Sequence, residues 1–197
     1  MRVDASGLTA WAKNLSQDAA QLSKADALRH HADVTLVFET VEACLPARFP
    51  TLFADEASLG AELERRGREL ATALDAVRGA CELGVTAVWT NPEIASPEVD
   101  AAAPGMRYML QRQAAIGGSE RRRMRAVEVA EALEREAGSG LRRARRRVCP
   151  STEVALSLAL LVERQAAAEL KQKLERQTQR DVRILVHGPW PPYTFAG

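Results

Sequence analysis

The side chains best suited to catalysis or metal binding in this sequence are three histidines, His30, His31 and His187. Two of them are adjacent, and neighbouring residues on a helix point in different directions. None of the three lies at a metal-ligand spacing from a cysteine or a carboxylate. The histidines are therefore interpreted as solvated or capping side chains, and no metal site is predicted.

The three cysteines, Cys44, Cys81 and Cys149, are far apart and include no Cys-x-x-Cys pair. An odd number of widely spaced cysteines suits buried thiols in a reducing compartment better than a disulfide framework. Gly-x-Ser-x-Gly, Gly-x-x-x-x-Gly-Lys and Gly-x-Gly-x-x-Gly motifs are also missing from the sequence. We therefore expect a cytoplasmic protein that is not an enzyme and uses no cofactor.

Arginines dominate the region from 121 to 147, where ten arginines face four glutamates, a local excess of six positive charges. Such a patch could hold phosphates or bind an acidic protein. However, no aromatic residue that could stack on bases lies between Tyr108 and Trp190. A solvated face that blocks strand pairing is the third interpretation. The sequence leaves these three alternatives open.

The C-terminal segment from His187 to Phe195 interleaves three prolines with three aromatic residues. Proline fixes its backbone and favours an extended preceding residue, so this segment is predicted to resemble polyproline II. With three residues per turn, Trp190 and Tyr193 would share one face, and Pro189, Pro192 and Phe195 another. The segment could cover its own domain or dock on another protein.

The overall composition describes an ordinary globular chain of 197 residues, with 46% hydrophobic residues and a net charge of +1. This balance creates no global field towards nucleic acid or an anionic membrane. The longest nearly uninterrupted apolar run, Val154 to Val162, is well short of the roughly 20 residues that span a bilayer. A soluble protein is expected.

The N-terminal part shows helical spacing. Apolar residues from Leu8 to Leu22 recur every three or four positions and predict a helix. A second helix is favoured from Lys24 onwards, although the β-branched run from Val34 to Val41 could form a strand. The segment from Leu45 to Phe53 is apolar but contains two prolines, which suggests an edge or bulged strand.

The rest of the chain alternates between strand and helix patterns. Asp55 is a predicted N-cap for a long helix, and Gly67 on its apolar stripe suggests a closely passing backbone. Thr90 to Gly105 is predicted to be a loop. The other predicted elements are a strand at 80–89, helices at 106–113 and 119–137 with a weak point at the glycines between them, an edge strand at 141–148, a central strand at 154–162, a helix at 163–177 and a strand at 181–186.

This order predicts an α+β fold, a ferredoxin-like split β-α-β sheet with inserted helices, preceded by an N-terminal helical segment. The expected domains are an N-terminal helical region at 1–43 and an α+β domain at 44–197. The second domain includes a helical insertion at about 105–138 and the proline- and aromatic-rich tail.

The tail also carries a resemblance. Gly188 to Phe195 resembles the Gly-Pro-Trp-Pro-Pro-Tyr-Ser-Phe ending of the gas vesicle protein GvpL/GvpF family, with Thr194 in place of the serine. Upstream, Leu45 to Thr51 is similar to the family's Leu-Pro-Leu-Arg-Phe-Gly-Thr, with Pro50 in place of the glycine. Glu82 to Val85 is similar to Glu-Trp-Gly-Val, and Gly105 to Met109 to Gly-x-x-Tyr-Leu.

The resemblance implies a non-enzymatic accessory protein of gas vesicle assembly that binds the hydrophobic shell subunit GvpA and other Gvp proteins. It also implies a strand that opens an N-terminal α+β domain, whereas this chain shows no such strand pattern and is expected to have that domain truncated. A nucleic-acid or acidic-partner binding module using residues 121–147 is the alternative function. The candidate partner-binding or signature residues are Arg48, Phe49, Tyr108, Gly188, Pro189, Trp190, Pro191, Pro192, Tyr193 and Phe195.

Overall fold

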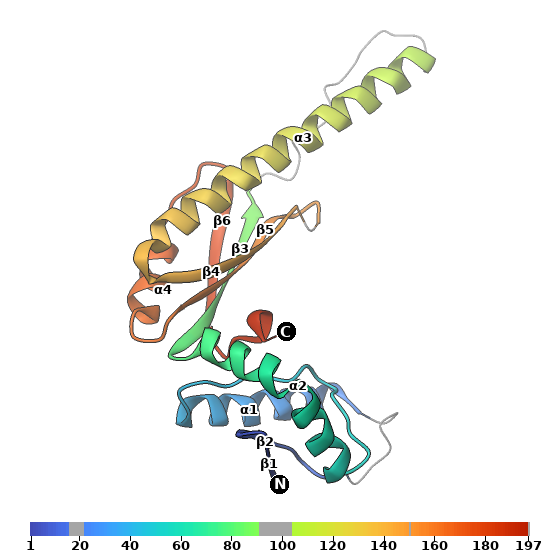
Figure 1. Ribbon diagram of the computed structural model, residues 1–197. Helices are drawn as coiled ribbons and strands as arrows, with labels where there is room; N and C mark the ends of the chain where they lie inside the picture. Colours follow the sequence, from blue (N-terminus) through green and yellow to red (C-terminus); the bar gives the residue numbers. More distant parts are fainter. Residues whose placement is uncertain (16–21, 91–103, 150, 197) are drawn as a thin grey trace. The chain divides into compact units, whose positions relative to one another are not determined.

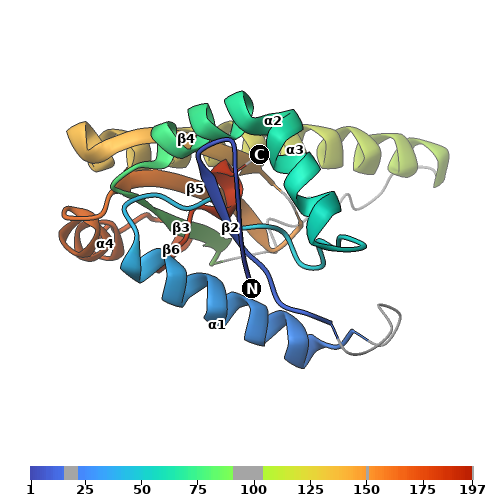
Figure 2. The same cartoon turned by 60° about the horizontal axis from the view of Figure 1, so that its bottom comes forward.

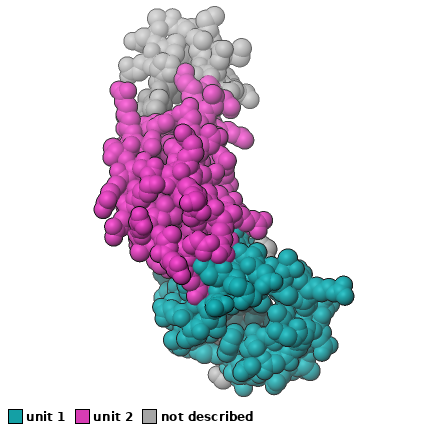
Figure 3. Space-filling model, turned by 60° about the vertical axis from the view of Figure 1, so that its left-hand side comes forward, with its two compact units in different colours: residues 1–82, 190–197 teal, residues 83–189 magenta. Residues whose placement is uncertain are grey.

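The computed structural model describes residues 1–15, 22–90, 104–149 and 151–196, and for residues 104–116 only the backbone. The chain divides into two compact units. Unit 1 consists of residues 1–82 and 190–197, and unit 2 of residues 83–189 (Figure 3). This division differs from the expected boundary between residues 43 and 44, because the long helix after Asp55 and the C-terminal tail both belong to the unit that holds the N-terminus.

Unit 1 combines a β-hairpin, two α-helices and a short C-terminal 3-10 helix (Figure 1). Its elements are β1 (Arg2–Ala5), β2 (Leu8–Trp11), α1 (Lys24–Thr40), α2 (Glu56–Val77) and η3 (Tyr193–Phe195). The hairpin packs against α2 (Figure 2), and its Val3 joins Leu59 and Leu63 of α2 in a buried apolar cluster. This small core fixes the N-terminus of the chain to α2.

The hairpin replaces the helix that the sequence predicts from Leu8 to Leu22. Val3 lies opposite Ala10 in its register, and Ser6 and Gly7 form the turn with φ values of 52° and 74°. Positive φ at both central positions is the geometry of a two-residue hairpin turn. The helix prediction is therefore wrong for residues 8–15, because this turn outweighs the helical spacing and residues 12–15 are not helical. Residues 16–21 lie outside the described residues. The expectation that no strand opens the chain is wrong for the same reason.

Both long helices of unit 1 begin at side-chain caps. Asp26 N–H donates to Ser23 Oγ (3.3 Å), and Ser23 N–H donates to Asp26 Oδ2 (2.9 Å), which closes a capping box before α1. Ser58 N–H donates to Asp55 Oδ1 (2.7 Å), so the predicted N-cap of α2 is confirmed. The hydrogen bonds from Ser58 also hold the pKa of Asp55 below its ordinary value. The helix prediction for the α1 region is confirmed over the strand alternative.

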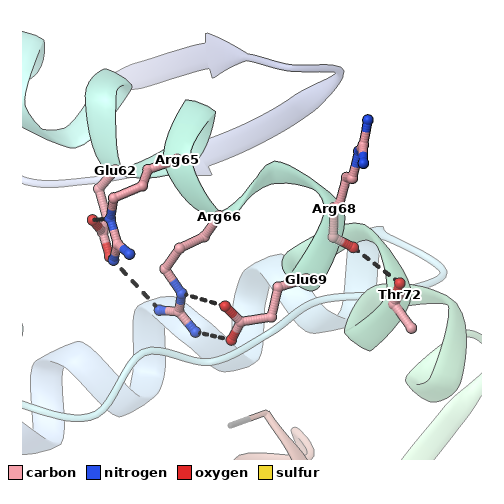
Figure 4. Close-up of polar contacts among 6 residues, drawn as sticks. All are labelled: Glu62, Arg65, Arg66, Arg68, Glu69 and Thr72. Atoms are coloured by element: carbon pink, nitrogen blue, oxygen red, sulfur yellow. Dashed lines mark hydrogen bonds and ion pairs between the residues drawn. The ribbon is translucent and has the colours of Figure 1, made fainter.

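The solvent side of α2 is lined by ion pairs. Arg65 Nη2 lies 2.6 Å from Glu62 Oε1, and Arg66 pairs with Glu69 one turn further on (Figure 4). Exposed pairs of this kind contribute little to stability. They keep this side of α2 polar, in contrast to the apolar side chains that other parts of unit 1 expose.

Gly67 marks a close approach between α2 and the hairpin turn, as the sequence predicted. A Cβ at this position would lie 3.0 Å from the Cβ of Ser6. In the same helix, a Cβ at Gly60 would meet nothing within 4 Å. An alanine at position 60 would therefore meet no neighbouring atom, whereas an alanine at position 67 would press against the hairpin turn.

We expect Gly60→Ala to stabilise unit 1 by about 0.5–1 kcal/mol, because alanine removes the conformational cost of a helical glycine. Gly67→Ala should give none of this gain, since the hairpin turn must move away to admit the methyl group. Urea denaturation of the two variants measures the difference. An equal gain at both positions would contradict the close packing of Ser6 on α2.

The segment from Leu45 to Phe53 is neither strand nor helix, so the predicted edge or bulged strand is wrong. Pro46 and Pro50 supply no backbone N–H for a strand ladder. Pro46 is buried, whereas Phe49 and Phe53 are 36% and 42% exposed. The segment lies as a loop with apolar side chains at its surface.

Unit 2 has the predicted ferredoxin-like order of strands and helices (Figure 1). Its four-stranded sheet has the order β4-β5-β3-β6, which is that of a split β-α-β fold. The predicted edge position of β4 and interior position of β5 are confirmed. The elements are β3 (Ala80–Trp89), α3 (Pro104–Ala137), β4 (Leu141–Val148), β5 (Val154–Glu163), α4 (Ala167–Glu175) and β6 (Val182–Trp190), with a 3-10 turn, η2 (Gly138–Gly140), between α3 and β4.

The two faces of this sheet differ in burial. Val85, Ala87 and Trp89 of β3 are buried, while Thr86 and Val88 between them are half-buried. The Arg122 guanidinium of α3 lies 5.9 Å from the centroid of the Trp89 ring, so the fully buried face is the one that α3 covers. We call the opposite side of the sheet the distal face.

α3 is one continuous helix, so the predicted weak point at Gly117 and Gly118 does not break it. The buried side of its C-terminal half consists of Ala126, Val129, Ala130, Leu133 and Ala137, whereas Met124 is 59% exposed. In the predicted loop before α3, residues 91–103 lie outside the described residues, and Pro104 and Gly105 belong to the helix. None of the described helices is long and apolar enough to cross a membrane.

Candidate partner-binding site

The C-terminal segment is a strand end followed by a turn, so the predicted polyproline II conformation is wrong. β6 continues through Trp190, and η3 follows. Tyr193 N–H donates to Pro191 O (2.8 Å) and Phe195 N–H to Pro192 O (3.1 Å). Polyproline II has no such internal hydrogen bonds. Local turn bonds thus fold the end of the chain back on itself.

The end of this segment, from Pro191 to Phe195, is largely buried within unit 1. Pro191 and Pro192 are fully buried, and Phe195 is 5% exposed. Trp190 is 42% exposed and Tyr193 is half-buried, so these two do not form the common exposed face that was expected. The tail therefore packs on its own unit, and Trp190 is the aromatic residue that it presents to solvent.

A buried carboxylate anchors the tail. Glu82, 7% exposed, accepts hydrogen bonds from Thr194 N–H (2.7 Å) and Thr194 Oγ1 (2.6 Å). Such charge-assisted bonds are among the stronger ones in proteins. Neither residue was among the predicted candidates, although both lie in segments that carry the family resemblance. The signal that could have found them is the hydroxyl that threonine shares with the family's serine.

The neighbouring Tyr193 contacts α1. His31 Nδ1 lies 3.1 Å from Tyr193 Oη, and the ring centroids are 5.8 Å apart. Burial raises the pKa of Tyr193 above its ordinary value, so the phenol keeps its proton at neutral pH and can hydrogen-bond to the imidazole. The tail is thus held by β3 on one side and by α1 on the other.

The second signature segment lies beside the other histidine. His30 Nε2 lies 3.0 Å from Ala47 O, and its ring centroid is 5.6 Å from that of Phe49. Arg48 is exposed, and its carbonyl accepts from Thr51 Oγ1 (2.5 Å). The adjacent histidines of α1 therefore connect two separate signature segments, one each.

The remaining candidates do not join this cluster. Gly188 belongs to unit 2, where its carbonyl accepts from Lys171 Nζ (2.9 Å), and the adjacent Pro189 is exposed in β6. Tyr108 lies in α3, and its side chain is outside the described part of the chain. Unit 1 thus buries Pro191, Pro192 and Phe195, links Phe49 and Tyr193 to the adjacent histidines of α1, and exposes Arg48 and Trp190.

Exposed apolar side chains are concentrated in unit 1. Among the described residues, every exposed large hydrophobic side chain except Met124 belongs to this unit. Leu28 and Leu36 of α1 are 61% and 64% exposed. Ala25, three positions before Leu28, and Ala32, midway between the two leucines, are exposed on the same side of the helix. We call these four residues the α1 stripe. In the same helix, Phe38 is buried, so α1 buries one apolar side chain while the α1 stripe faces solvent.

The arginine-rich region is divided between internal contacts and solvent. Arg125 bonds to Asp181 through Nε and Nη2 (3.1 and 3.0 Å), and this hydrogen bonding raises its pKa further above the ordinary value. Arg122 stacks on Trp89, as described above, and Arg142 Nε bonds to Glu163 Oε1 (2.6 Å). Part of the region is therefore structural rather than a single basic patch.

The potential metal ligands and nucleophiles remain dispersed. Among the described residues, no group of three or more His, Cys, Asp or Glu could hold a metal ion. Cys44 and Cys81 are buried and Cys149 is half-buried, all as free thiols. Burial raises the pKa of the Cys149 thiol, although Arg122 and Arg123 oppose the shift, so this thiol is not activated as a nucleophile.

Known proteins provide an independent comparison. Gas vesicle protein L of Streptomyces sp. (strain CB03234) is 29% identical over 187 residues, which cover 88% of this chain and 70% of that protein. The crystal structure of GvpF from Microcystis aeruginosa shares the fold with a TM-score of 0.72 at 15% identity, covering 100% of this chain and 88% of that one. GvpF from Anabaena sp. PCC7120 also gives 0.72 at 15% identity, covering 96% and 83%.

The family model described as "Gas vesicle synthesis protein GvpL/GvpF" matches residues 2–197. This match includes the N-terminal hairpin, the segment from Leu45 to Thr51 and the anchored tail. The chain therefore belongs to the GvpL/GvpF family of gas vesicle proteins.

Proposed function

We propose that this protein is a non-enzymatic assembly factor that binds the hydrophobic shell subunit GvpA, together with other Gvp proteins, in the cytoplasm during vesicle formation. Membership of the GvpL/GvpF family supports a role connected with gas vesicles. The contact with GvpA is the further step. It rests on a physical requirement, since a subunit that will face gas must be shielded from water before assembly.

The observation that carries this proposal is the concentration of exposed apolar side chains in unit 1. The α1 stripe presents Ala25, Leu28, Ala32 and Leu36 to solvent on successive turns of one helix. An amphipathic helix normally buries such a stripe. A hydrophobic partner would cover these side chains and gain the free energy of their transfer from water.

The anchored tail has a supporting role in this proposal. Thr194 bonds to Glu82 of β3, Tyr193 contacts His31 of α1, and Pro191, Pro192 and Phe195 are buried. Removing the tail would therefore disturb unit 1 as a whole and would not report on binding alone. Point substitutions in the exposed α1 stripe are the sharper test.

We expect the double variant Leu28→Glu and Leu36→Glu to reduce binding of GvpA at least about tenfold, because two apolar contacts are replaced by charges. Co-purification of GvpA with the tagged full chain measures retention. Met124→Glu is the matched control, since Met124 is 59% exposed but belongs to unit 2. Equal retention by the double variant and the wild-type chain would sink the proposal, provided both remain folded by circular dichroism.

A further inference from the structure

The exposed side of α1 has the residue pattern of a surface that pairs with another helix. In the α1 stripe, small and large side chains alternate at spacings of three and four residues, in the order Ala25, Leu28, Ala32 and Leu36. A small residue between two leucines lets a second helix approach closely, because the distance between packed helices depends on the side chains at the contact. The leucines then pack on either side of the closest point. The stripe therefore has a shape that another helix fits.

Charged side chains of opposite sign lie at the two ends of the stripe. Lys24 is the first residue of α1 and Glu39 belongs to its last turn, and both are exposed. Lys24 lies one turn before Leu28, and Glu39 lies one turn after Leu36, so both border the stripe. Among the described residues, neither Lys24 nor Glu39 forms an ion pair. The stripe thus has a positive charge at its start and a negative charge at its end.

These features complement one another when two copies of α1 pack in opposite directions. With Ala32 of one copy against Ala32 of the other, Leu28 of each copy lies opposite Leu36 of the second copy. Lys24 of each copy then lies near Glu39 of the second copy, once at each end of the pair. Two helices that ran in the same direction would instead place like charges together at each end, which is unfavourable. The charges therefore select the antiparallel arrangement.

From this pattern we propose that the α1 stripe is a self-association surface, through which two copies of this chain form an antiparallel dimer. Burial of the two leucines of each copy removes apolar surface from water. The two pairs of Lys24 with Glu39 fix the direction and the register of the helices. Because α1 has only 17 residues, the contact is small, and the dimer is expected to be weak and concentration-dependent.

The dimer and the proposed complex with GvpA use the same surface of unit 1. One stripe cannot hold a second copy and the shell subunit at the same time. Self-association therefore keeps Leu28 and Leu36 away from water until the subunit takes the place of the second copy. This regulatory role rests on the proposed function, whereas the pairing of two chains requires no GvpA.

Sedimentation equilibrium of the full chain at low ionic strength, without GvpA, measures the dissociation constant of the dimer. We expect Glu39→Lys to raise this constant about tenfold, because two attractive pairs become two repulsive ones, and Lys24→Glu to do the same. The double variant restores both pairs with exchanged signs and should dimerise like the wild-type chain. Both substitutions place charge favourably for the helix dipole, so α1 should stay folded, which circular dichroism checks.

Glu64→Lys is the matched control, because Glu64 is an exposed glutamate of α2 and its replacement changes the net charge equally. This control should leave the dissociation constant of the dimer unchanged. An effect of Glu64→Lys equal to that of Glu39→Lys would overturn the proposal, since only net charge would matter. A double variant that dimerises no better than the two single variants would also overturn it, because Lys24 and Glu39 would then not meet.

The outcomes separate this proposal from the proposed function. A wild-type chain that stays monomeric up to about 1 mM but retains GvpA would refute the dimer alone. A chain that dimerises as expected but does not retain GvpA would refute the assembly role and leave the self-association surface in place.

Discussion

Replacing Phe195 by alanine is expected to lower the free energy of unfolding of unit 1 by about 3–5 kcal/mol, the usual cost of truncating a buried phenylalanine. Phe195 is 5% exposed, and the fully buried Pro191 and Pro192 precede it in the same tail. The loss combines the apolar area of the ring with the cavity that its removal leaves. Hydrogen exchange of α1 amides, followed by mass spectrometry, reports the loss locally.

Trp190→Ala is the matched control for this prediction. Trp190 is an aromatic residue of the same tail but is 42% exposed, so its truncation should cost clearly less. Equal losses at the two positions would contradict the burial of the tail within unit 1. A Phe195→Ala chain with unchanged exchange in α1 would mean that the tail does not stabilise the unit at all.

Replacing Glu82 by alanine is expected to destabilise unit 1 by about 2 kcal/mol, because the N–H and hydroxyl of Thr194 lose their common acceptor. Thr194→Ala removes only the hydroxyl bond and should cost about 1 kcal/mol. Urea denaturation of the single and double variants gives the coupling between the two residues. A double variant that loses the sum of both single effects would show that they do not interact.

Thr194→Ser provides the conservative control for this pair. Serine keeps the hydroxyl that donates to Glu82, and it is the residue in the family's ending that the tail resembles. Its stability should stay within about 0.5 kcal/mol of the wild-type chain. A large loss would assign the anchoring to the threonine methyl group instead of the hydrogen bond.

Much of unit 2 was predictable from local pattern. The alternate spacing of Val85, Ala87 and Trp89 in the sequence predicts β3. The double-sided apolar run of β5 predicts an interior strand. The arginines of β4 predict an edge. Each of these strands is eight to ten residues long, so its pattern repeats often enough to be distinguished from that of a helix.

Unit 1 was harder to predict, and the reasons are physical. The hairpin depends on positive φ at Ser6 and Gly7, whereas the three-and-four spacing of Leu8 and Trp11 fits a helix equally well. The α1 stripe has the spacing of a buried face but is exposed. Periodicity states which residues share a side; it does not state whether another element covers that side.

The α+β class, the order of elements in unit 2 and, through the Gly188 to Phe195 signature, the family could be predicted from sequence patterns alone. The hydrogen bonds from Thr194 to Glu82, 112 positions away, appear only in the folded structure. The same is true of the burial of Pro191, Pro192 and Phe195 within unit 1. Local patterns report the preferences of neighbouring residues, whereas these contacts depend on which distant segments the fold brings within a few ångströms of one another.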